Sequence, residues 1–158
     1  NVLVSRGSII PLFHEQIKSG EPLTITSPDM TRFLLSLDQA VDIVFSAIRF
    51  AKPGEIYIPR VPSARIIDLA QALIGDRKNE IKVIGVRPGE KMHEILISEE
   101  ELFRSIKRDE YYVVLPILPS LQCQEVSQPL LEKEFSSADD LLSMDGLIAL
   151  LEKNNLMV

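Results

Sequence analysis

Short β-branched segments alternate with amphipathic segments along most of this chain, and the alternation limits the fold more than any other feature. The first kind has the length and composition of strands, and the second has apolar residues at helical spacing. Interleaved strands and helices predict an α/β fold. The expected strands are residues 23–26, 30–35, 55–58, 81–84 and 111–115, and the expected helices are residues 9–19, 38–51, 64–75, 91–97 and 144–154.

The start of the chain and a late proline-rich segment predict less regular structure. Asn1–Ser5 is apolar and β-branched, so we expect the end of a buried strand that began before residue 1. The chain starts without Met and without a signal segment, which favours a partial or processed product. Residues 116–135 contain Pro116, Pro119 and Pro129 and predict an irregular surface excursion.

Composition argues against several classes of protein. With 158 residues, 46% apolar and 25% charged, the chain can form a core and is not a disordered tail. No apolar run reaches the roughly 18 residues of a membrane span. The net charge of −6 argues against nucleic acid as the main partner. The single cysteine, Cys123, excludes an intrachain disulfide and fits a cytoplasmic location. We expect no metal site of the Cys/His kind, since the only histidines, His14 and His93, lie far apart in sequence.

Arginines beside glycine, proline or a strand end are the main candidates for ligand binding. Arg6, Arg32 and Arg87 occupy such positions. A guanidinium presents a planar fork that suits phosphate oxygens, so arginines on loops around a sheet edge could clamp a diphosphate. Alternatively each arginine pairs with a surface carboxylate, because the chain has 23 acidic residues.

The stretch Arg87–Glu94, with the sequence Arg-Pro-Gly-Glu-Lys-Met-His-Glu, is the most unusual in the chain. Glu90 could accept hydrogen bonds from ribose hydroxyls, or it could simply match the dipole of a helix. His93 could act as a general base or as a hydrogen-bonded structural residue. Asp139 and Asp140 could bind a cation or lie at a solvated helix entrance.

The remaining features are assigned structural roles. The apolar rows Val41/Val44/Ile48 and Leu147/Leu150/Leu151 are expected to be core stripes. Cys123 has no nearby His or Lys to activate it and is expected to be inert. The sequence contains no glycine-rich phosphate loop and no Tyr-x-x-x-Lys pair, so we expect no catalytic residue in this chain.

Four separate motifs, in order along the chain, carry a family resemblance that covers nearly the whole chain: Asn1–Phe13, Pro28–Phe33, Arg87–Ser98 and Asp109–Tyr112. They closely resemble the C-terminal half of the bacterial capsule-type UDP-N-acetylglucosamine 4,6-dehydratases, of the extended short-chain dehydrogenase/reductase superfamily. The late segment Glu134–Ser143 also resembles that group's tail. Residues 55–60 and 62–65 are similar to the subset that also epimerises C5.

The resemblance implies the substrate-binding, C-terminal part of an extended short-chain dehydrogenase/reductase fold of the NAD(P)-binding Rossmann type, with the N-terminal nucleotide-binding part absent. Residues 1–115 would grip the nucleotide-sugar, and residues 116–158 would pack on them as an extension. The positions similar to the family's diphosphate, ribose and cleft residues are Asn1, Arg6, Ser8, Arg32, Arg87 and Glu90.

The resemblance also implies a reaction for which this chain would supply only part of the substrate binding. In the family NAD or NADP, bound mainly by the N-terminal part, takes hydride from C4, water leaves across C5–C6, and hydride returns to C6. We therefore expect a cytoplasmic enzyme of surface polysaccharide biosynthesis, homo-oligomeric at full length, of which this part binds the UDP-sugar and is inactive alone.

Two alternatives stay open. Half of a UDP-sugar 4-epimerase would need the same clamp without elimination at C6. A stand-alone, non-catalytic module that binds nucleotides or a protein belongs to a different class. A complete core with no frayed strand at residues 1–5 would favour the module.

Overall fold

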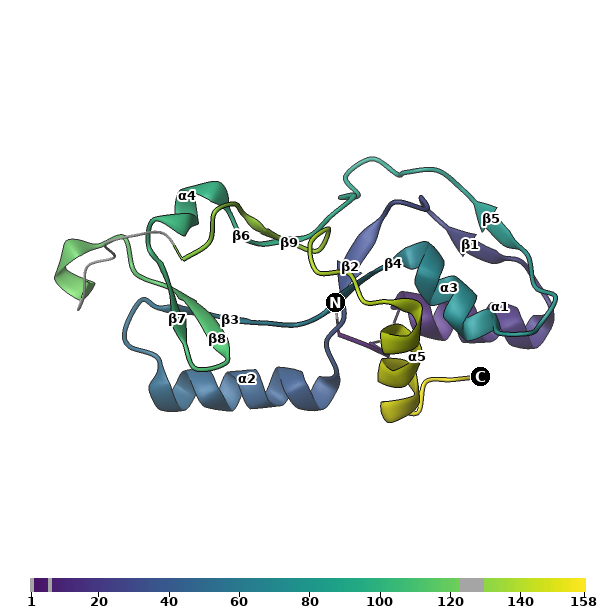
Figure 1. Cartoon of the computed structure of the whole chain (residues 1–158), viewed down its shortest axis with the longest axis horizontal. Coiled ribbons are helices and arrows are strands. Elements are labelled where there is room, and N and C mark those ends of the chain that lie inside the picture. Colours follow the sequence, from purple (N-terminus) through teal and green to yellow (C-terminus); the bar gives the residue numbers. More distant parts are fainter. Residues whose placement is uncertain (1, 6, 123–129) are drawn as a thin grey trace. The chain divides into compact units, whose positions relative to one another are not determined.

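The computed structural model describes residues 2–5, 7–122 and 130–158 (Figure 1). The chain folds into two compact units that are interleaved in the sequence. Unit 1 comprises Asn1–Leu37, Pro62–Glu94 and Ser137–Val158, and unit 2 comprises Asp38–Val61 and Ile95–Ser136. The sequence-based division between residues 115 and 116 follows motifs rather than contacts, and it falls inside unit 2.

Two small sheets form the strand layer of unit 1. β1 (Leu23–Ile25) pairs in parallel with β5 (Ile81–Val83). β2 (Thr31–Phe33) pairs antiparallel with β4 (Ser63–Arg65), so that Arg32 lies opposite Ala64. The strand β4 leads directly into a helix that begins at Ile66, and the Ile66 N–H donates to the Met30 carbonyl at 2.8 Å, so the start of β2 lies beside the start of that helix.

Three helices supply most of the core of unit 1. α1 (Ile9–Ser19) ends at Gly20, whose φ of 70° lies in the left-handed region that favours glycine. α5 (Met144–Lys153) begins after Ser143, whose hydroxyl accepts a hydrogen bond from the Gly146 N–H. Both helices pack against α3 (Ile66–Ile74). Fully buried side chains of this core include Ile10, Phe13, Leu23, Leu69, Leu73, Leu147 and Leu151.

Unit 2 is built on a three-stranded antiparallel sheet in the order β3 (Ile56–Pro59), β8 (Tyr111–Val114), β7 (Ser105–Arg108). A second antiparallel pair joins β6 (Ile95–Ile97) to β9 (Phe135–Ser136). The short helix α4 (Glu99–Leu102) begins with a capping box between Ser98 and Glu101, and η1 (Pro119–Leu121) is a single 3₁₀ turn. The core of unit 2 contains Ile58, Ile97, Leu102 and Val114.

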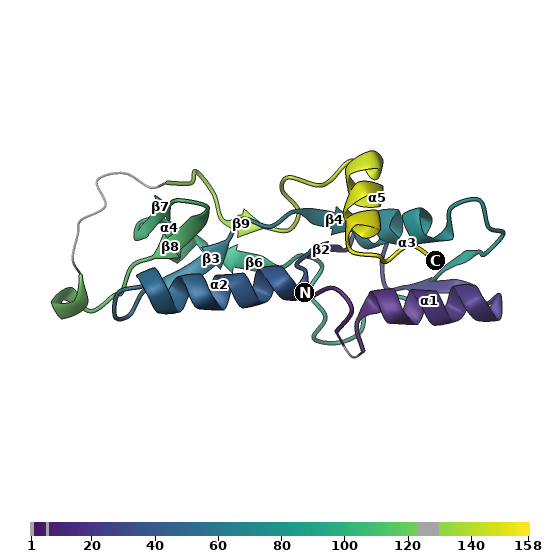
Figure 2. The ribbon, with the colours of Figure 1, turned by 90° about the horizontal axis from the view of Figure 1, so that it is seen from below.

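The helix α2 (Leu37–Phe50) runs alongside the sheet of unit 2 (Figures 1 and 2). Tyr111 of β8 donates a hydrogen bond from its hydroxyl to Ser46 Oγ at 3.0 Å. Three apolar residues of α2 were expected to form a core stripe. Instead Val41 is 45% exposed, Val44 57% and Ile48 76%, so that prediction is wrong. Helical periodicity shows which residues share a face, but not what covers that face.

Some expected elements differ from the structure because long-range pairing decides them. The predicted helix over residues 91–97 is wrong, since Ile95–Ile97 forms β6 by pairing with the distant β9. The expected opening strand is reduced to one parallel bridge between Val2 and Leu35, and Val4 leaves the extended conformation with a φ of 62°. The strands β4 and β7 were not predicted.

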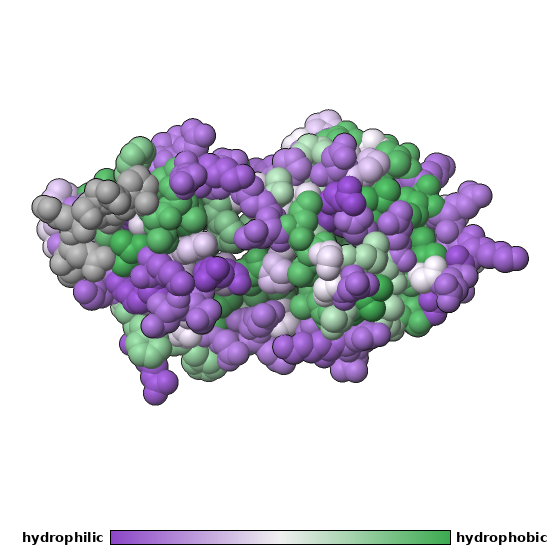
Figure 3. Space-filling model, viewed as in Figure 1, coloured by the Kyte–Doolittle hydropathy of each residue, from purple (hydrophilic) through white to green (hydrophobic). Residues whose placement is uncertain are grey.

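Apolar side chains are interspersed with hydrophilic ones on the face in Figure 3. Within residues 2–5, 7–122 and 130–158, none of the helices combines the length and apolar character that a membrane crossing requires.

Candidate functional site

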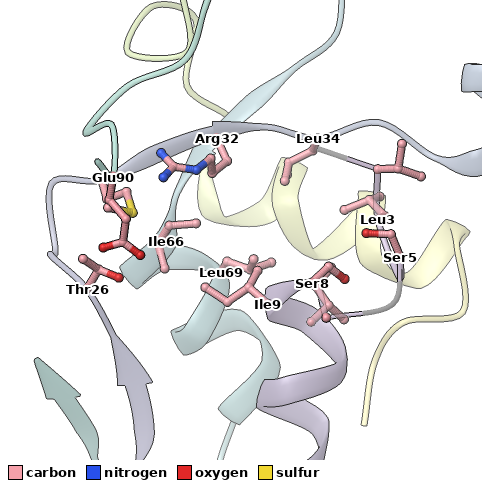
Figure 4. A pocket seen from close by; sticks show the side chains of 14 residues that line it. Leu3, Ser5, Ser8, Ile9, Thr26, Arg32, Leu34, Ile66, Leu69 and Glu90 are labelled. Atoms are coloured by element: carbon pink, nitrogen blue, oxygen red, sulfur yellow. The ribbon is translucent and has the colours of Figure 1, made fainter. Parts of the chain in front are cut away.

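A cavity of about 390 Å³ lies in unit 1 beside the start of α1 (Figure 4). Its apolar floor includes Ile66 and Leu69 of α3. Three of the residues that the sequence singled out line this cavity: Ser8, Arg32 and Glu90. They come from the turn before α1, from β2 and from the loop after β5, so the fold gathers three separate segments around one space.

The N-terminus of α1 lies at the cavity. The first amides of a helix have no partner within the helix, and this positive end favours anions. Ile9 and Ile10, the first two helical residues, both line the cavity. Ser8 Oγ is buried, makes no cap to its own helix, and has no hydrogen-bond partner among the described residues. Leaving a buried hydroxyl unpaired is unfavourable, and a ligand oxygen in the cavity would satisfy it.

Arg32 brings a positive charge to the other side of the cavity from Ser8 (Figure 4). Its Nη1 donates to the carbonyl oxygens of Thr31 at 2.7 Å and Met92 at 3.3 Å, and its Nε lies 3.6 Å from Glu94 Oε1. The side chain is only 17% exposed. Among the described residues these contacts use Nη1 and Nε, which leaves Nη2 for an anion in the cavity.

Glu90 adds a carboxylate on the same side of the cavity as Arg32 and Thr26 (Figure 4). Its Oε2 accepts a hydrogen bond from the Arg87 N–H at 2.9 Å, and its own N–H donates to the Arg87 carbonyl at 3.0 Å. This turn fixes the backbone of the loop. A cation together with a carboxylate suits a ligand that carries both phosphate and hydroxyl groups.

The other residues singled out by sequence do not line the cavity or are not described. Arg87 lies exposed in its loop and is not among the lining residues. Asn1, Arg6 and Cys123 lie outside the described residues. The structure therefore brings Ser8, Arg32 and Glu90 together, while the substrate-binding roles of all six residues stay predictions.

A set of hydrogen bonds behind Arg32 was missed by sequence reasoning. Thr31 Oγ1 lies 2.8 Å from His93 Nδ1 and 2.7 Å from Ser137 Oγ. Ser137 Oγ also accepts from the Glu94 N–H at 2.9 Å, and the Ser137 N–H donates to the Glu94 carbonyl at 2.8 Å. His93 thus has a structural hydrogen bond. Thr31 and Ser137 both belong to motifs of the family resemblance, but their pairing could not be read from one sequence.

The acidic residues Asp139 and Asp140 follow β9. No cluster of His, Cys, Asp and Glu within the described ranges is suited to hold a metal ion. The Asp139 carbonyl accepts a hydrogen bond from Ser63 Oγ at 3.0 Å, which ties this segment to β4.

Comparison with known sequences identifies the family. A family profile described as polysaccharide biosynthesis protein matches residues 1–116. The chain belongs to the polysaccharide biosynthesis protein family. The predicted kinship with nucleotide-sugar epimerases and dehydratases of the short-chain dehydrogenase/reductase type is confirmed at this level, whereas a specific 4,6-dehydratase is not.

Two curated relatives illustrate the range of this family. The chain is 49% identical over 125 residues to "Uncharacterized membrane protein MJ1061" of Methanocaldococcus jannaschii, which covers 73% of the chain and 38% of that protein. It is 50% identical over 114 residues to a UDP-glucose 4-epimerase of Rickettsia massiliae, which covers 71% of the chain and 33% of that protein. The chain thus spans about a third of the length of these relatives.

A solved structure shares the fold. The X-ray structure of Pen from Bacillus thuringiensis superposes with a TM-score of 0.87 at 30% sequence identity. The match covers 99% of this chain and 49% of the Pen chain. The mixed α/β architecture of this chain is therefore that of about half of the Pen chain.

The described residues do not fit the pyrophosphate of a dinucleotide cofactor. A dinucleotide fold needs several glycines in the turn between a strand and a helix. The turn before α1 has one glycine, Gly7, and β4 enters α3 through Arg65 without any. We derive no step through NAD or NADP from this chain.

Proposed function

We propose that the cavity of unit 1 binds the diphosphate of a UDP-sugar, and that this chain is the substrate-binding part of a nucleotide-sugar enzyme. One observation carries the proposal: the buried Ser8 hydroxyl has no hydrogen-bond partner among the described residues, and Ser8 lines the same cavity as Arg32 at the positive end of α1. Arg32 would bind phosphate oxygens, the α1 amides would bind the same anion, and Glu90 would accept hydrogen bonds from sugar hydroxyls.

The reaction proposed for the whole protein is a 4,6-dehydration of UDP-N-acetylglucosamine, with or without C5 epimerisation, in surface polysaccharide biosynthesis. The motifs around Arg32 and Arg87 support it through the family resemblance. A UDP-sugar 4-epimerase is the second candidate, because the Rickettsia relatives carry that name. Both reactions need the same grip on the UDP group, so the cavity does not favour one over the other.

The proposal includes a cofactor and an assembly that lie beyond the described residues. NAD or NADP would be held mainly by another part of the protein, which we expect to be cytoplasmic and homo-oligomeric. The 158-residue chain alone is expected to form no 4-keto product from UDP-N-acetylglucosamine with added NADP.

A titration with UDP, UMP and uridine, followed by nuclear magnetic resonance, tests the binding proposal. UDP should bind more tightly than uridine, and Arg32→Gln should weaken UDP binding by about tenfold or more while leaving uridine unaffected. Arg49→Gln on α2 removes an equal charge outside unit 1 and should change nothing. Arg87→Gln should have a smaller effect than Arg32→Gln, since Arg87 does not line the cavity. Equal affinity of the wild-type chain for UDP and uridine would reject the proposal.

A further inference from the structure

The C-terminal segment Ser137–Val158 lies beyond the residues that the family profile matches, yet it belongs to unit 1. Leu147 and Leu151 of α5 are fully buried in the core of that unit. The Leu142 N–H donates to the Ser63 carbonyl at 2.9 Å, which joins the segment to β4. The segment is therefore an integral part of the unit that contains the cavity.

Ser137 connects this segment to residues that neighbour Arg32. The residue is completely buried, and Thr31 is 2% exposed. Ser137 Oγ lies 2.7 Å from Thr31 Oγ1, and two further hydrogen bonds join Ser137 to the backbone of Glu94. One buried serine thus links three segments: the C-terminal segment, β2, and the loop that ends at Glu94.

The groups that hold Arg32 belong to two of those segments. Arg32 Nη1 donates to the Thr31 carbonyl, and the carboxylate of Glu94 lies 3.6 Å from Nε. The third contact is the Met92 carbonyl, which also accepts from the Thr31 N–H at 3.0 Å. These three acceptors therefore belong to direct partners of Ser137 or lie within two residues of one.

We propose that Ser137 is a positioning residue for Arg32, which acts through Thr31 and Glu94 to set the direction of the guanidinium at the cavity. This proposal rests on the proposed function, in which Arg32 binds the diphosphate of UDP. A hydroxyl is needed at both Ser137 and Thr31. Ser137 Oγ accepts a hydrogen bond from the Glu94 N–H, and a second hydrogen bond joins Ser137 Oγ to Thr31 Oγ1. An alanine or valine cannot replace either contact.

Four variants of the full 158-residue chain test the proposal, with UDP as the probe. Ser137→Ala and Thr31→Val should each weaken UDP binding about fivefold, because a misdirected guanidinium would lose about one hydrogen bond to the diphosphate. Thr31→Ser keeps the hydroxyl and should bind like the wild type. Ser143→Ala is the matched control: it removes the N-cap of α5 in the same segment but does not touch Arg32 or its partners. It should lower the melting temperature and leave the UDP affinity unchanged.

A second readout separates positioning from mere stability. The Arg32 Nε–H should exchange with solvent faster in Ser137→Ala than in the wild type, and not faster in Ser143→Ala. If Ser137→Ala lowers the melting temperature like Ser143→Ala, with unchanged UDP affinity and Nε–H exchange, the positioning role is wrong. If the wild-type chain does not bind UDP at all, the proposed function fails, and the exchange measurement alone decides whether Ser137 orients Arg32.

Discussion

The ion pair between Glu55 and Arg108 in unit 2 gives the clearest energetic prediction. Arg108 Nη1 and Nη2 donate to the two carboxylate oxygens of Glu55 at 2.6 and 2.7 Å, and Nη1 also donates to the Tyr57 hydroxyl at 2.9 Å. The Glu55 side chain is 3% exposed. Replacing Arg108 by Met would therefore leave a buried carboxylate whose remaining donor is the Lys52 N–H.

The magnitude follows from that geometry. Breaking a fully buried ion pair by removing one partner costs about 3–5 kcal/mol. Arg108 is 24% exposed and Glu55 keeps its hydrogen bond from the Lys52 N–H, and both facts make the expected loss of stability smaller than this. We expect Arg108→Met to lower the free energy of unfolding by about 2–3 kcal/mol at neutral pH.

The loss should depend on pH in a defined direction. The hydrogen bonds from Arg108 lower the pKa of Glu55 below its ordinary value of 4.5, against the opposing effect of burial. Because the folded-state pKa is the lower one, the pair contributes fully above about pH 4.5 and its contribution is lost as the pH falls through the folded pKa. The difference between the wild type and Arg108→Met should therefore shrink in acid.

Urea unfolding followed by circular dichroism, at neutral pH and below about pH 4, measures both effects. Arg65→Met is the matched control, because Arg65 forms a similar two-bond pair with Asp68 but its own side chain is 50% exposed. That change should have little effect at either pH. A loss in Arg108→Met that is as small as in the control, or that stays constant with pH, would refute the reasoning.

Two further predictions concern the surface of α2 and the end of α1. Because Ile48 is exposed, Ile48→Lys should leave the free energy of unfolding within about 0.5 kcal/mol of the wild type and should reduce binding of an apolar dye. A loss above about 1 kcal/mol would show instead that Ile48 is buried. Gly20→Ala should lower the free energy of unfolding by about 1 kcal/mol through its left-handed φ alone, since an added Cβ meets no atom within 4 Å; an unchanged free energy in a urea titration would contradict this.

Local patterns predicted much of the fold. The helix over residues 9–19 follows from apolar spacing before Gly20, and the structure has α1 at Ile9–Ser19. The last helix follows from the same signals, with Ser143 as its cap. These helices depend on residues that are close together in the sequence, so the sequence alone is enough to predict them.

Long-range contacts were not readable in the same way. Ile95–Ile97 is a strand because it pairs with Phe135–Ser136, and no local pattern records that partner. The outward row of α2 looked like a core stripe because periodicity does not state what covers a face. At the candidate site, the local sequence context singled out Arg32 and Glu90, and the family resemblance added to that reading. The buried link between Thr31 and Ser137 instead depends on two segments that meet only in the fold.

The central claim is that the cavity beside α1 receives the diphosphate of a nucleotide-sugar. Mapping the amide and arginine Nε signals of the 158-residue chain during titration with UDP tests it most directly. The account predicts the largest shifts at the amides of Ile9 and Ile10 and at Arg32 Nε. Shifts confined to unit 2, or none in the presence of saturating UDP, would contradict it.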